Sequence, residues 1–127
     1  MSSSPFDKQR VDRVSKPWGY ELIWSRTGRY VGKVLHINAG ESLSRQYHRI
    51  KDETLFLIAG RVRLHLSADG ESRDVIMEVG DSYHIVPGLI HQIEALEDSD
   101  IVEVSTPELD DVVRLEDRYG RAGTSEP

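Results

Sequence analysis

Hydrophobic and polar residues alternate along much of this chain with a period of two, which is the period of a half-buried β-strand. The clearest example is Arg61–Ser67, where Val62, Leu64 and Leu66 share one face of the predicted strand. The turn residues that follow, Ser67–Gly70, predict a hairpin. The other predicted strands are Tyr20–Ser25, Tyr30–Asn38, Ser44–His48, Thr54–Ala59, Arg73–Val79, Ser82–Val86, Gln92–Leu96 and Ile101–Ser105.

The chain has no window of helical periodicity before about residue 108. Residues 107–117 are acidic with a few aliphatic side chains, and they predict either an irregular strand or a short helix. Many short strands punctuated by glycine and proline are typical of a sandwich or a barrel. Closure of the sheet also removes exposed strand edges. We therefore predict an all-β fold, a small double-stranded β-barrel.

The length of 127 residues is enough for one domain with a single core. We expect a flexible segment at 1–15, the domain at 16–121 and a disordered tail at 122–127. Because there is no cysteine, disulfides, thiolate metal sites and cysteine nucleophiles are excluded. The N-terminus has no signal-peptide pattern and no run approaches transmembrane length, so we expect a cytoplasmic protein without a membrane partner. A net charge of −6 with scattered basic residues predicts no nucleic-acid partner.

Four polar residues on predicted strands have the chemistry of metal ligands. Gln46 and His48 are two residues apart, so both side chains leave the same face of a strand. Glu53 begins an apolar run, and His91 closes a second segment bounded by glycines. Burying such groups is unfavourable unless a partner satisfies them, and one divalent ion would satisfy all four. The donor set suits Zn, Mn, Co, Ni or Fe, and the competing interpretation is a site that has lost its metal.

The spacing of these residues resembles the cupin family, whose first motif is G-x5-H-x-H-x4-E-x6-G and whose second is G-x5-P-x-G-x2-H-x3-N. The first motif is matched throughout, with Gln46 in the place of the first histidine. The second motif is matched in part, because Val86 replaces its proline and Ala95 its asparagine. The resemblance implies a double-stranded β-helix, the cupin or jelly-roll barrel, and a bound metal. The matching positions are Gly40, Gln46, His48, Glu53, Gly60, Gly80, Gly88 and His91.

A narrower group is similar over residues 16–121: the cupin domain of type II phosphomannose isomerases, often fused to a mannose-1-phosphate guanylyltransferase. Its R-P-W-G opening corresponds to Lys16–Gly19, and its P-G-E-x-L-S-x-Q-x-H motif corresponds to Ala39–His48. Gln46 is the residue that this group itself carries. The end motif E-D-x-Y-G-R corresponds to Glu116–Arg121. We expect no nucleotide chemistry, because the similarity does not include a guanylyltransferase domain.

The chain departs from this group between His48 and Glu53. The group continues with two histidines and an arginine, whereas this chain has Arg49, Ile50 and Lys51. The aromatic residue or histidine that commonly follows the glutamate is Thr54 here. The ligand positions are therefore kept, while part of the rim that shapes sugar specificity has changed.

The resemblance implies a metal-dependent aldose–ketose isomerase that acts on a phosphorylated sugar such as mannose 6-phosphate or fructose 6-phosphate. The metal would stabilise an enediolate. His84 and Glu116 are the candidates for the proton-transfer base. The phosphate of such a sugar would be bound by lysine or arginine side chains. Lys16 is a possible phosphate-binding residue in addition to the four candidates named next. The candidate phosphate-binding residues are Lys33, Arg45, Arg118 and Arg121.

Two other classes of function remain open from the sequence. One is a different metal-cupin enzyme, a dioxygenase or a lyase, that uses His48, Glu53 and His91 around an open coordination position. The other is a non-catalytic cupin that binds a sugar or another metabolite, whose mark is stabilisation by ligand without turnover. In each case the partner is a small molecule, and the fold leads us to expect a homodimer.

Overall fold

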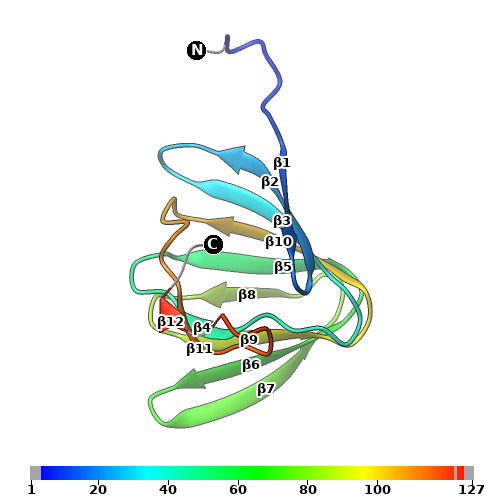
Figure 1. Ribbon diagram of the computed structural model, residues 1–127, viewed down its shortest axis with the longest axis vertical. Helices are drawn as coiled ribbons and strands as arrows, with labels where there is room; N and C mark the ends of the chain where they lie inside the picture. Colours follow the sequence, from blue (N-terminus) through cyan, green and yellow to red (C-terminus); the bar gives the residue numbers. More distant parts are fainter. Residues whose placement is uncertain (1–3, 122, 125–127) are drawn as a thin grey trace.

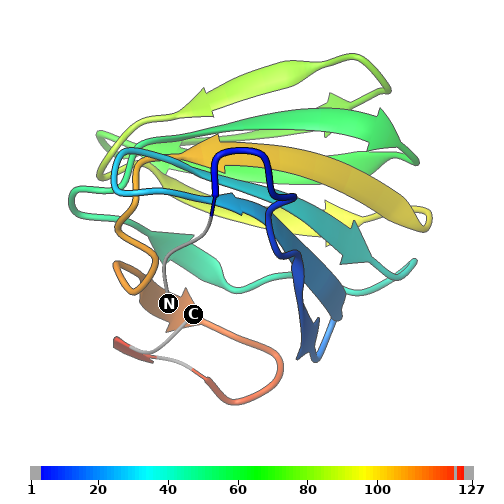
Figure 2. The ribbon, with the colours of Figure 1, turned by 90° about the horizontal axis from the view of Figure 1, so that it is seen from above.

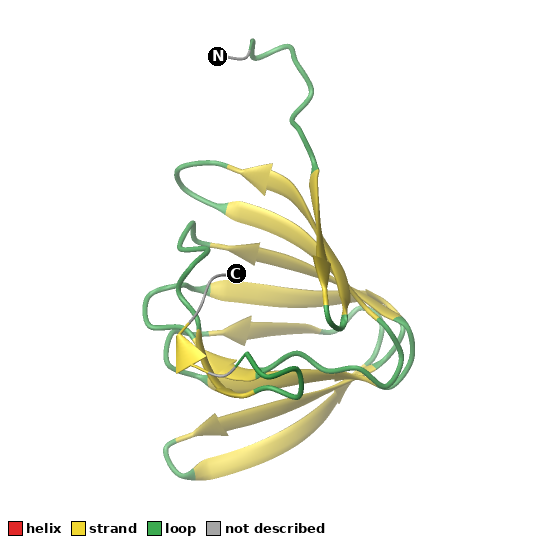
Figure 3. Cartoon of the chain, in the orientation of Figure 1, coloured by secondary structure: helices red, strands yellow, loops and turns green. Residues whose placement is uncertain are grey.

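The computed structural model describes residues 4–121 and 123–124. Within these ranges every regular element is a β-strand, and the strands are joined by turns and loops alone (Figure 3). The strands form two antiparallel six-stranded sheets whose inner faces enclose the core. The all-β prediction is confirmed. No helix in the described part of the chain is long and apolar enough to cross a membrane.

The first sheet, sheet A, contains strands from both ends of the chain. Its strand β10, which is late in the sequence, lies between two much earlier strands (Figure 1). The strands in spatial order are β1 (Asp12–Lys16), β2 (Gly19–Arg26), β3 (Val31–Ile37), β10 (Ser99–Ser105), β5 (Glu53–Ala59) and β8 (Ser82–Ile85).

The second sheet, sheet B, is built around the pair β9 and β6, and the C-terminal strands join it through β4 (Figure 2). The strands in spatial order are β12 (Gly123–Thr124), β11 (Val113–Glu116), β4 (Arg45–Tyr47), β9 (Ile90–Ala95), β6 (Val62–Ala68) and β7 (Glu71–Met77). Within the acidic 107–117 region, 113–116 form strand β11 and 107–112 form turns and loop, so the region is in part a short strand and contains no helix.

Each of the nine strands predicted from the alternation is present, with bounds that differ by a few residues. The hairpin of β6 and β7 turns at Asp69 and Gly70, which both have positive φ, as a tight hairpin turn requires. Strand β1 was not predicted, and it takes in Asp12–Ser15 from the segment 1–15 that we expected to be flexible. It pairs with β2 from Asp12 to Lys16. In the tail, β12 pairs with β11, while 122 and 125–127 lie outside the described residues.

The core is made by the inward members of the alternating strands. Leu55 and Leu57 of β5, Leu64 of β6 and Ile101 of β10 are fully buried, and Trp18 packs into the same cluster. Burial of each such aliphatic side chain contributes about 1.5–3 kcal/mol. The same alternation points charged residues inward near one end of the barrel, where the apolar core stops and a polar cavity begins.

Candidate metal centre and charged cavity

Three of the predicted metal ligands come together inside the barrel, at the end where the apolar core stops. Glu53 is the first residue of β5 and faces inward with Leu55 and Leu57. His91 lies on β9, and His48 directly follows β4. One ligand atom from each of the three side chains lies within 4.8 Å of the others, and all three residues are buried. Because the cluster joins both sheets, it forms only when the barrel is closed.

The two imidazoles are held with their Nε2 atoms toward Glu53. His48 donates its Nδ1–H to the carbonyl oxygen of Asp111 at 2.6 Å, and His91 donates its Nδ1–H to the carbonyl oxygen of Leu89 at 2.9 Å. Since a carbonyl only accepts, Nδ1 carries the hydrogen and Nε2 of the neutral ring has a free lone pair. Such a bond from the second nitrogen to a backbone carbonyl is typical of metal-ligating histidines.

The resulting contact between acceptor atoms fits a cation. Nε2 of His48 lies 2.6 Å from Oε1 of Glu53, and Nε2 of His91 lies 3.9 Å from the same oxygen. Nε2 of His48 and Oε1 of Glu53 are buried and have no hydrogen-bond partner among the described residues. A buried polar atom without a partner is unfavourable. A divalent ion would satisfy these atoms together.

The protonation states also suit a metal. Burial alone would raise the pKa of Glu53, but a proton shared with Nε2 of His48 in the absence of an ion and the positive charge of Lys51 outweigh it and hold the pKa well below the ordinary value. Burial lowers the pKa of His91, against the opposing charge of Glu53. The site therefore offers an ionised carboxylate and a neutral imidazole, the forms in which these side chains bind metal.

The fourth predicted ligand, Gln46, lies beside the cluster. It is the residue directly opposite His91 in the pairing of β4 with β9, and it lines the same cavity as His48. The hydroxyl of Ser44 donates to its Oε1 at 2.6 Å, which leaves that oxygen a second lone pair. Two imidazole nitrogens, a carboxylate and an amide oxygen form a donor set for Zn, Mn, Co, Ni or Fe.

Asp111 fixes the loop that carries His48. Its carboxylate accepts the backbone N–H groups of Arg49, Ile50 and Lys51 at 3.1, 2.7 and 2.8 Å. These bonds hold the pKa of Asp111 below its ordinary value, although burial acts in the opposite direction. Its carbonyl oxygen meanwhile accepts from His48, so one residue of the C-terminal segment holds both the ligand and the loop behind it.

Two buried residues of the site were missed by the sequence analysis. The sequence places Lys51 in a changed rim, but its side chain is only 6% exposed and its Nζ lies 3.0 Å from Oε2 of Glu103. Burial alone would lower the pKa of Lys51, yet the carboxylates of Glu103 and Glu53 raise it. Burial and the charge of Glu53 raise the pKa of Glu103. One lysine therefore lies between two carboxylates next to the metal cluster.

A cavity of about 70 Å³ opens beside His48 and Gln46, with room for a few water molecules. Leu109 and Val112 of the C-terminal segment line it together with Trp18. Its charged lining is mostly positive. The charged residues are Lys16, Lys33, Lys51, Arg114 and Arg121 with Glu21 and Glu103.

Successive strands of sheet A each contribute one buried or nearly buried charged side chain near this cavity. In the strand order β1, β2, β3, β10, β5 these side chains are Lys16, Glu21, Lys33, Glu103 and Glu53. Nζ of Lys33 lies 3.4 Å from both carboxylate oxygens of Glu21, and Nζ of Lys16 lies 3.9 Å from Oε1 of Glu21. We call these five residues the charged row. The row ends at the metal cluster.

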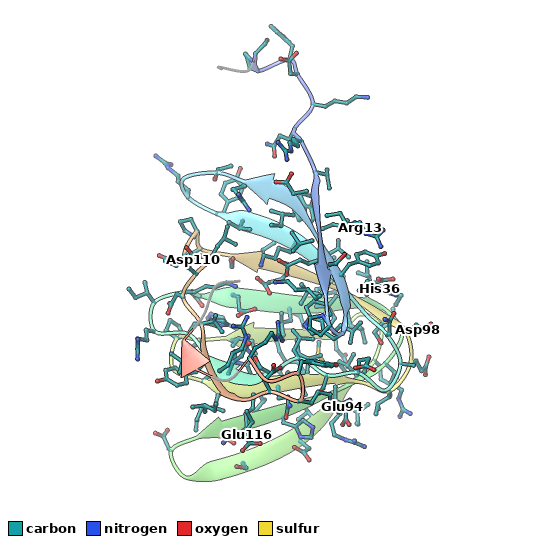
Figure 4. The ribbon with its side chains drawn as sticks, viewed as in Figure 1. Arg13, His36, Glu94, Asp98, Asp110 and Glu116 are labelled. Atoms are coloured by element: carbon teal, nitrogen blue, oxygen red, sulfur yellow. The ribbon has the colours of Figure 1, made fainter. Side chains whose placement is uncertain are left out.

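The structure does not bring the two predicted bases to this cavity. Ile85 of β8 is buried, so His84 leaves the opposite face, where its Nε2 lies 2.6 Å from Oδ1 of Asp52. Its side chain is 58% exposed. Glu116 is exposed on the outside of the barrel, where Figure 4 labels it. Lys51 and Glu103 are the titratable groups that line the cavity where His84 and Glu116 were expected.

The predicted phosphate-binding residues divide into two pairs. Lys33 and Arg121 line the cavity. Arg45 instead lies near the β6–β7 hairpin, in a surface depression with Asp69 and Glu71. Arg118 donates to the carbonyl oxygen of Gly40 at 2.7 Å and is 45% exposed. Lys16, which we noted as a possibility, and Arg114, which we did not predict, occupy the cavity in their place.

Comparison with known sequences supports the resemblance. The sequence profile of the family described as Cupin domain matches residues 33–106. The mannose-1-phosphate guanylyltransferase ManC of Salmonella typhimurium is 35% identical over 117 residues, which cover 85% of this chain and 23% of the relative. The mannose-1-phosphate guanylyltransferase of Escherichia coli is 35% identical over 124 residues, covering 90% and 24%. The chain thus spans about a quarter of the length of these relatives.

Solved structures share the fold at low sequence identity. KdgF from Halomonas sp. is 21% identical with a TM-score of 0.65, over 81% of this chain and 92% of that one. The capsular polysaccharide assembling protein CapF of Staphylococcus aureus is 18% identical with a TM-score of 0.65, over 87% and 32%. An oxalate decarboxylase of Bacillus subtilis is 16% identical with a TM-score of 0.73, over 87% and 32%. At these identities the likeness concerns the fold alone.

Proposed function

The chain belongs to the cupin domain family, and from that premise we propose that it is a metal-dependent aldose–ketose isomerase of a phosphorylated sugar, such as mannose 6-phosphate and fructose 6-phosphate. The observation that carries the proposal is the juxtaposition of the acceptor cluster of His48, Glu53 and His91 with a cavity of mostly positive lining. The names of the curated relatives, which refer to a mannose phosphate, support the choice of sugar.

The ion would be held by His48, Glu53 and His91, with Gln46 as a fourth donor. When bound, a divalent ion supplies Lewis-acid stabilisation of negative charge that develops on oxygen. The protein itself fixes the direction of both imidazoles through the carbonyl groups of Asp111 and Leu89. Such fixed orientation means that the donors need not reorganise during the reaction.

Isomerisation also needs a group that moves a proton between C1 and C2. Glu103 lies beside the cluster and faces the cavity, and Lys51 pairs with it at 3.0 Å. We assign the proton-transfer role to Glu103 on the basis of this position. Lys51 then acts as a positioning residue that keeps the carboxyl group directed toward the substrate.

The test is a coupled isomerase assay on mannose 6-phosphate. The protein is stripped of metal, restored with Zn, Mn, Co, Ni or Fe(II), and compared with His48→Ala. The matched control is His65→Ala, because His65 lies on the outer face of β6 in contact with Asp74. We expect turnover that requires metal, is lost in His48→Ala and is kept in His65→Ala.

Absence of turnover from protein that binds metal stoichiometrically would exclude the isomerase. Activity that needs Fe(II) and oxygen would instead identify a dioxygenase, and stabilisation by a sugar phosphate without turnover would identify a binding protein. The homodimer expected from the fold stays a prediction, which sedimentation velocity would test.

A further inference from the structure

The outer faces of the two sheets differ in chemistry. On sheet B the outward side chains are mostly polar and pair with one another: Arg63 donates to Glu94 at 2.9 Å, and the hydroxyls of Ser67 and Ser72 lie 2.8 Å apart. An antiparallel sheet with one face in water typically has such a polar outer face. On sheet A the outward side chains of the inner strands are apolar instead. They are Leu22, Trp24, Val34, Phe56, Val102 and Val104.

The apolar residues of sheet A form a continuous row across four strands. Val34 of β3 lies opposite Leu22 of β2 on one side and opposite Val102 of β10 on the other. Val102 in turn lies opposite Phe56 of β5. Side chains that lie directly opposite each other on antiparallel strands are within contact distance. The row is therefore a contiguous patch in the middle of the sheet and not a scatter of single apolar residues.

Trp24 widens this patch because it lies over a glycine. A Cβ atom at Gly32 of β3 would come within 2.7 Å of three atoms of the indole ring. Glycine at this position therefore lets the indole lie against the backbone of the sheet. Val104, directly opposite Gly32, continues the patch onto β10. Trp24, Val104 and the exposed Tyr30 line a depression of about 440 Å³ on this face.

No described segment of the chain covers the outer face of sheet A. Its side chains Trp24, Phe56, Ile58 and Val104 are between 40% and 47% exposed. Residues 4–11 are exposed throughout and extend away from β1 (Figure 1), and the C-terminal strands belong to sheet B. A contiguous apolar patch in water is unfavourable and is typical of a surface that binds a partner.

The size of the face matches the requirement of a dimer interface. Sheet A has six strands, and β3, β5 and β10 have seven residues each. With about 4.8 Å between strands and about 3.3 Å per residue, the face measures roughly 550 Å². Two such faces in contact would bury about 1,100 Å², which exceeds the roughly 1,000 Å² expected of a specific interface.

The rim of the face is polar and carries both signs of charge. Arg13 lies over the ring of Tyr20, and Tyr20 stacks on His36. His36 contacts Asp100 at 2.7 Å. Because the net charge of the chain is −6, two copies repel each other least where the contacting surfaces hold cations as well as anions. Charged residues of both signs at this rim are Arg13, Arg29, Asp52 and Asp100.

We infer that the outer face of sheet A binds the same face of a second copy of this chain, with the two sheets packed face to face about a two-fold axis. An apolar centre within a polar rim is the usual anatomy of a protein interface, and a flat face of mixed charge is complementary to itself. The fold alone predicts a homodimer without specifying its surface, whereas the apolar row specifies the surface. The metal cluster lies inside the barrel, so the dimer does not depend on the proposed reaction.

The test compares the same substitution on the two outer faces. Ile58→Lys places a charge on the apolar face, and Ile76→Lys places it on β7 of sheet B, where the isoleucine is similarly exposed, at 37% against 44%. Each substitution occurs twice in a two-fold dimer, and an unpaired charge buried in an interface is strongly unfavourable. In sedimentation velocity at micromolar concentration, we expect dimers of the wild type and of Ile76→Lys. The Ile58→Lys dimer should be weakened by roughly 100-fold or more.

Val104→Lys is the second variant on the apolar face, because Val104 is 47% exposed and tolerates a longer side chain in the monomer. It should also be monomeric, and circular dichroism shows whether each variant is folded. The two tryptophans report the contact separately: Trp18 is buried in the barrel, whereas Trp24 lies on the apolar face. Acrylamide should quench the fluorescence of Trp24 less in the wild type than in Ile58→Lys. In the Trp24→Phe background this difference should disappear.

A wild type that is monomeric at micromolar concentration would overturn the inference, and so would an assembly larger than a dimer. Folded Ile58→Lys and Val104→Lys proteins that dimerise as the wild type does would place the interface elsewhere. The same conclusion would follow from a wild-type dimer in which acrylamide reaches Trp24 as easily as in the monomeric variant. Loss of the dimer in Ile76→Lys would assign the contact to sheet B instead.

Discussion

Asp111 holds His48 through its main chain: its carbonyl oxygen accepts the Nδ1–H of the imidazole at 2.6 Å. The two residues are 63 positions apart in the sequence. The carboxylate of Asp111 at the same time accepts three backbone N–H groups of the loop that follows His48. The C-terminal segment is therefore part of the candidate metal centre, although it supplies none of the predicted ligands.

We predict that Asp111→Ala weakens metal binding by about 10- to 100-fold, the usual effect of removing a partner that orients a ligand. Without the carboxylate the 49–51 loop loses three hydrogen bonds, and the carbonyl beside His48 is no longer fixed. Titration against a chelator of known affinity measures the change. Asp110→Ala is the control, since Asp110 is exposed one residue away (Figure 4). Equal affinity in both variants would contradict a positioning role for Asp111.

Lys51→Met should destabilise the protein by about 3–5 kcal/mol, because it leaves the carboxylate of Glu103 buried without its cation. Lys51→Arg should retain most of the stability, since it keeps the charge at this position. Urea unfolding measures both free energies. Lys8→Met changes an exposed lysine and should have almost no effect. If Lys51→Met were as stable as Lys8→Met, the buried ion pair would have no net role in stability.

Glu103→Gln should lower kcat of the isomerase by roughly 10²–10⁴-fold, the contribution of a general acid or base. The amide has nearly the same shape, so stoichiometric metal binding should persist. Steady-state kinetics and metal analysis on the same sample separate the two effects. Glu94→Gln alters a carboxylate on the outer face that pairs with Arg63, and kcat should be unchanged. Loss of metal from Glu103→Gln would show a role in holding the ion instead of moving a proton.

Acid should destabilise the C-terminal segment through Asp117. Burial alone would raise the pKa of Asp117, but the hydrogen bonds and the charge of Arg121 lower it below the ordinary value. A lowered pKa in the folded state adds stability above the unfolded-state value near 4, and this stability is lost as the pH falls through the lower folded value. Asp117→Asn should therefore reduce the slope of stability against pH below about 4. Urea unfolding at several pH values compares the slopes, with Asp110→Asn as the control.

The clustering of the candidate metal ligands could be predicted because their spacing is short and their strands are strongly patterned. Gln46 and His48 are separated by a single residue, and Glu53 leads directly into Leu55 and Leu57, which set its phase toward the core. Period-two alternation therefore carries the information. The same rule, applied to Ile85, would have directed His84 to the outside. The nearness of His84 to His91 in sequence favours the pocket instead, but the His84 side chain is exposed.

The missed residues lay where the local pattern is ambiguous. On β10 Glu103 is buried while its neighbours Val102 and Val104 face outward, so the apolar residues favour the wrong phase. Ile101 is the apolar residue of β10 that indicates the correct phase, because it is buried on the same face as Glu103. Lys51 lies in a loop, where alternation gives no direction. Its burial depends on the contacts of Asp111, which no local pattern reports.

The central place of β10 in sheet A also determines how the chain can fold. Its partners β3 and β5 are complete before residue 60, yet the edge of each strand that pairs with β10 stays unpaired until residues 99–105 are available. A chain that ends before β10 would expose two unpaired strand edges in the middle of a sheet, which favours aggregation. Pairing over such sequence distances is slow, with folding times of milliseconds to seconds typical of β-barrels. Nascent chains therefore stay vulnerable until nearly the whole domain has left the ribosome.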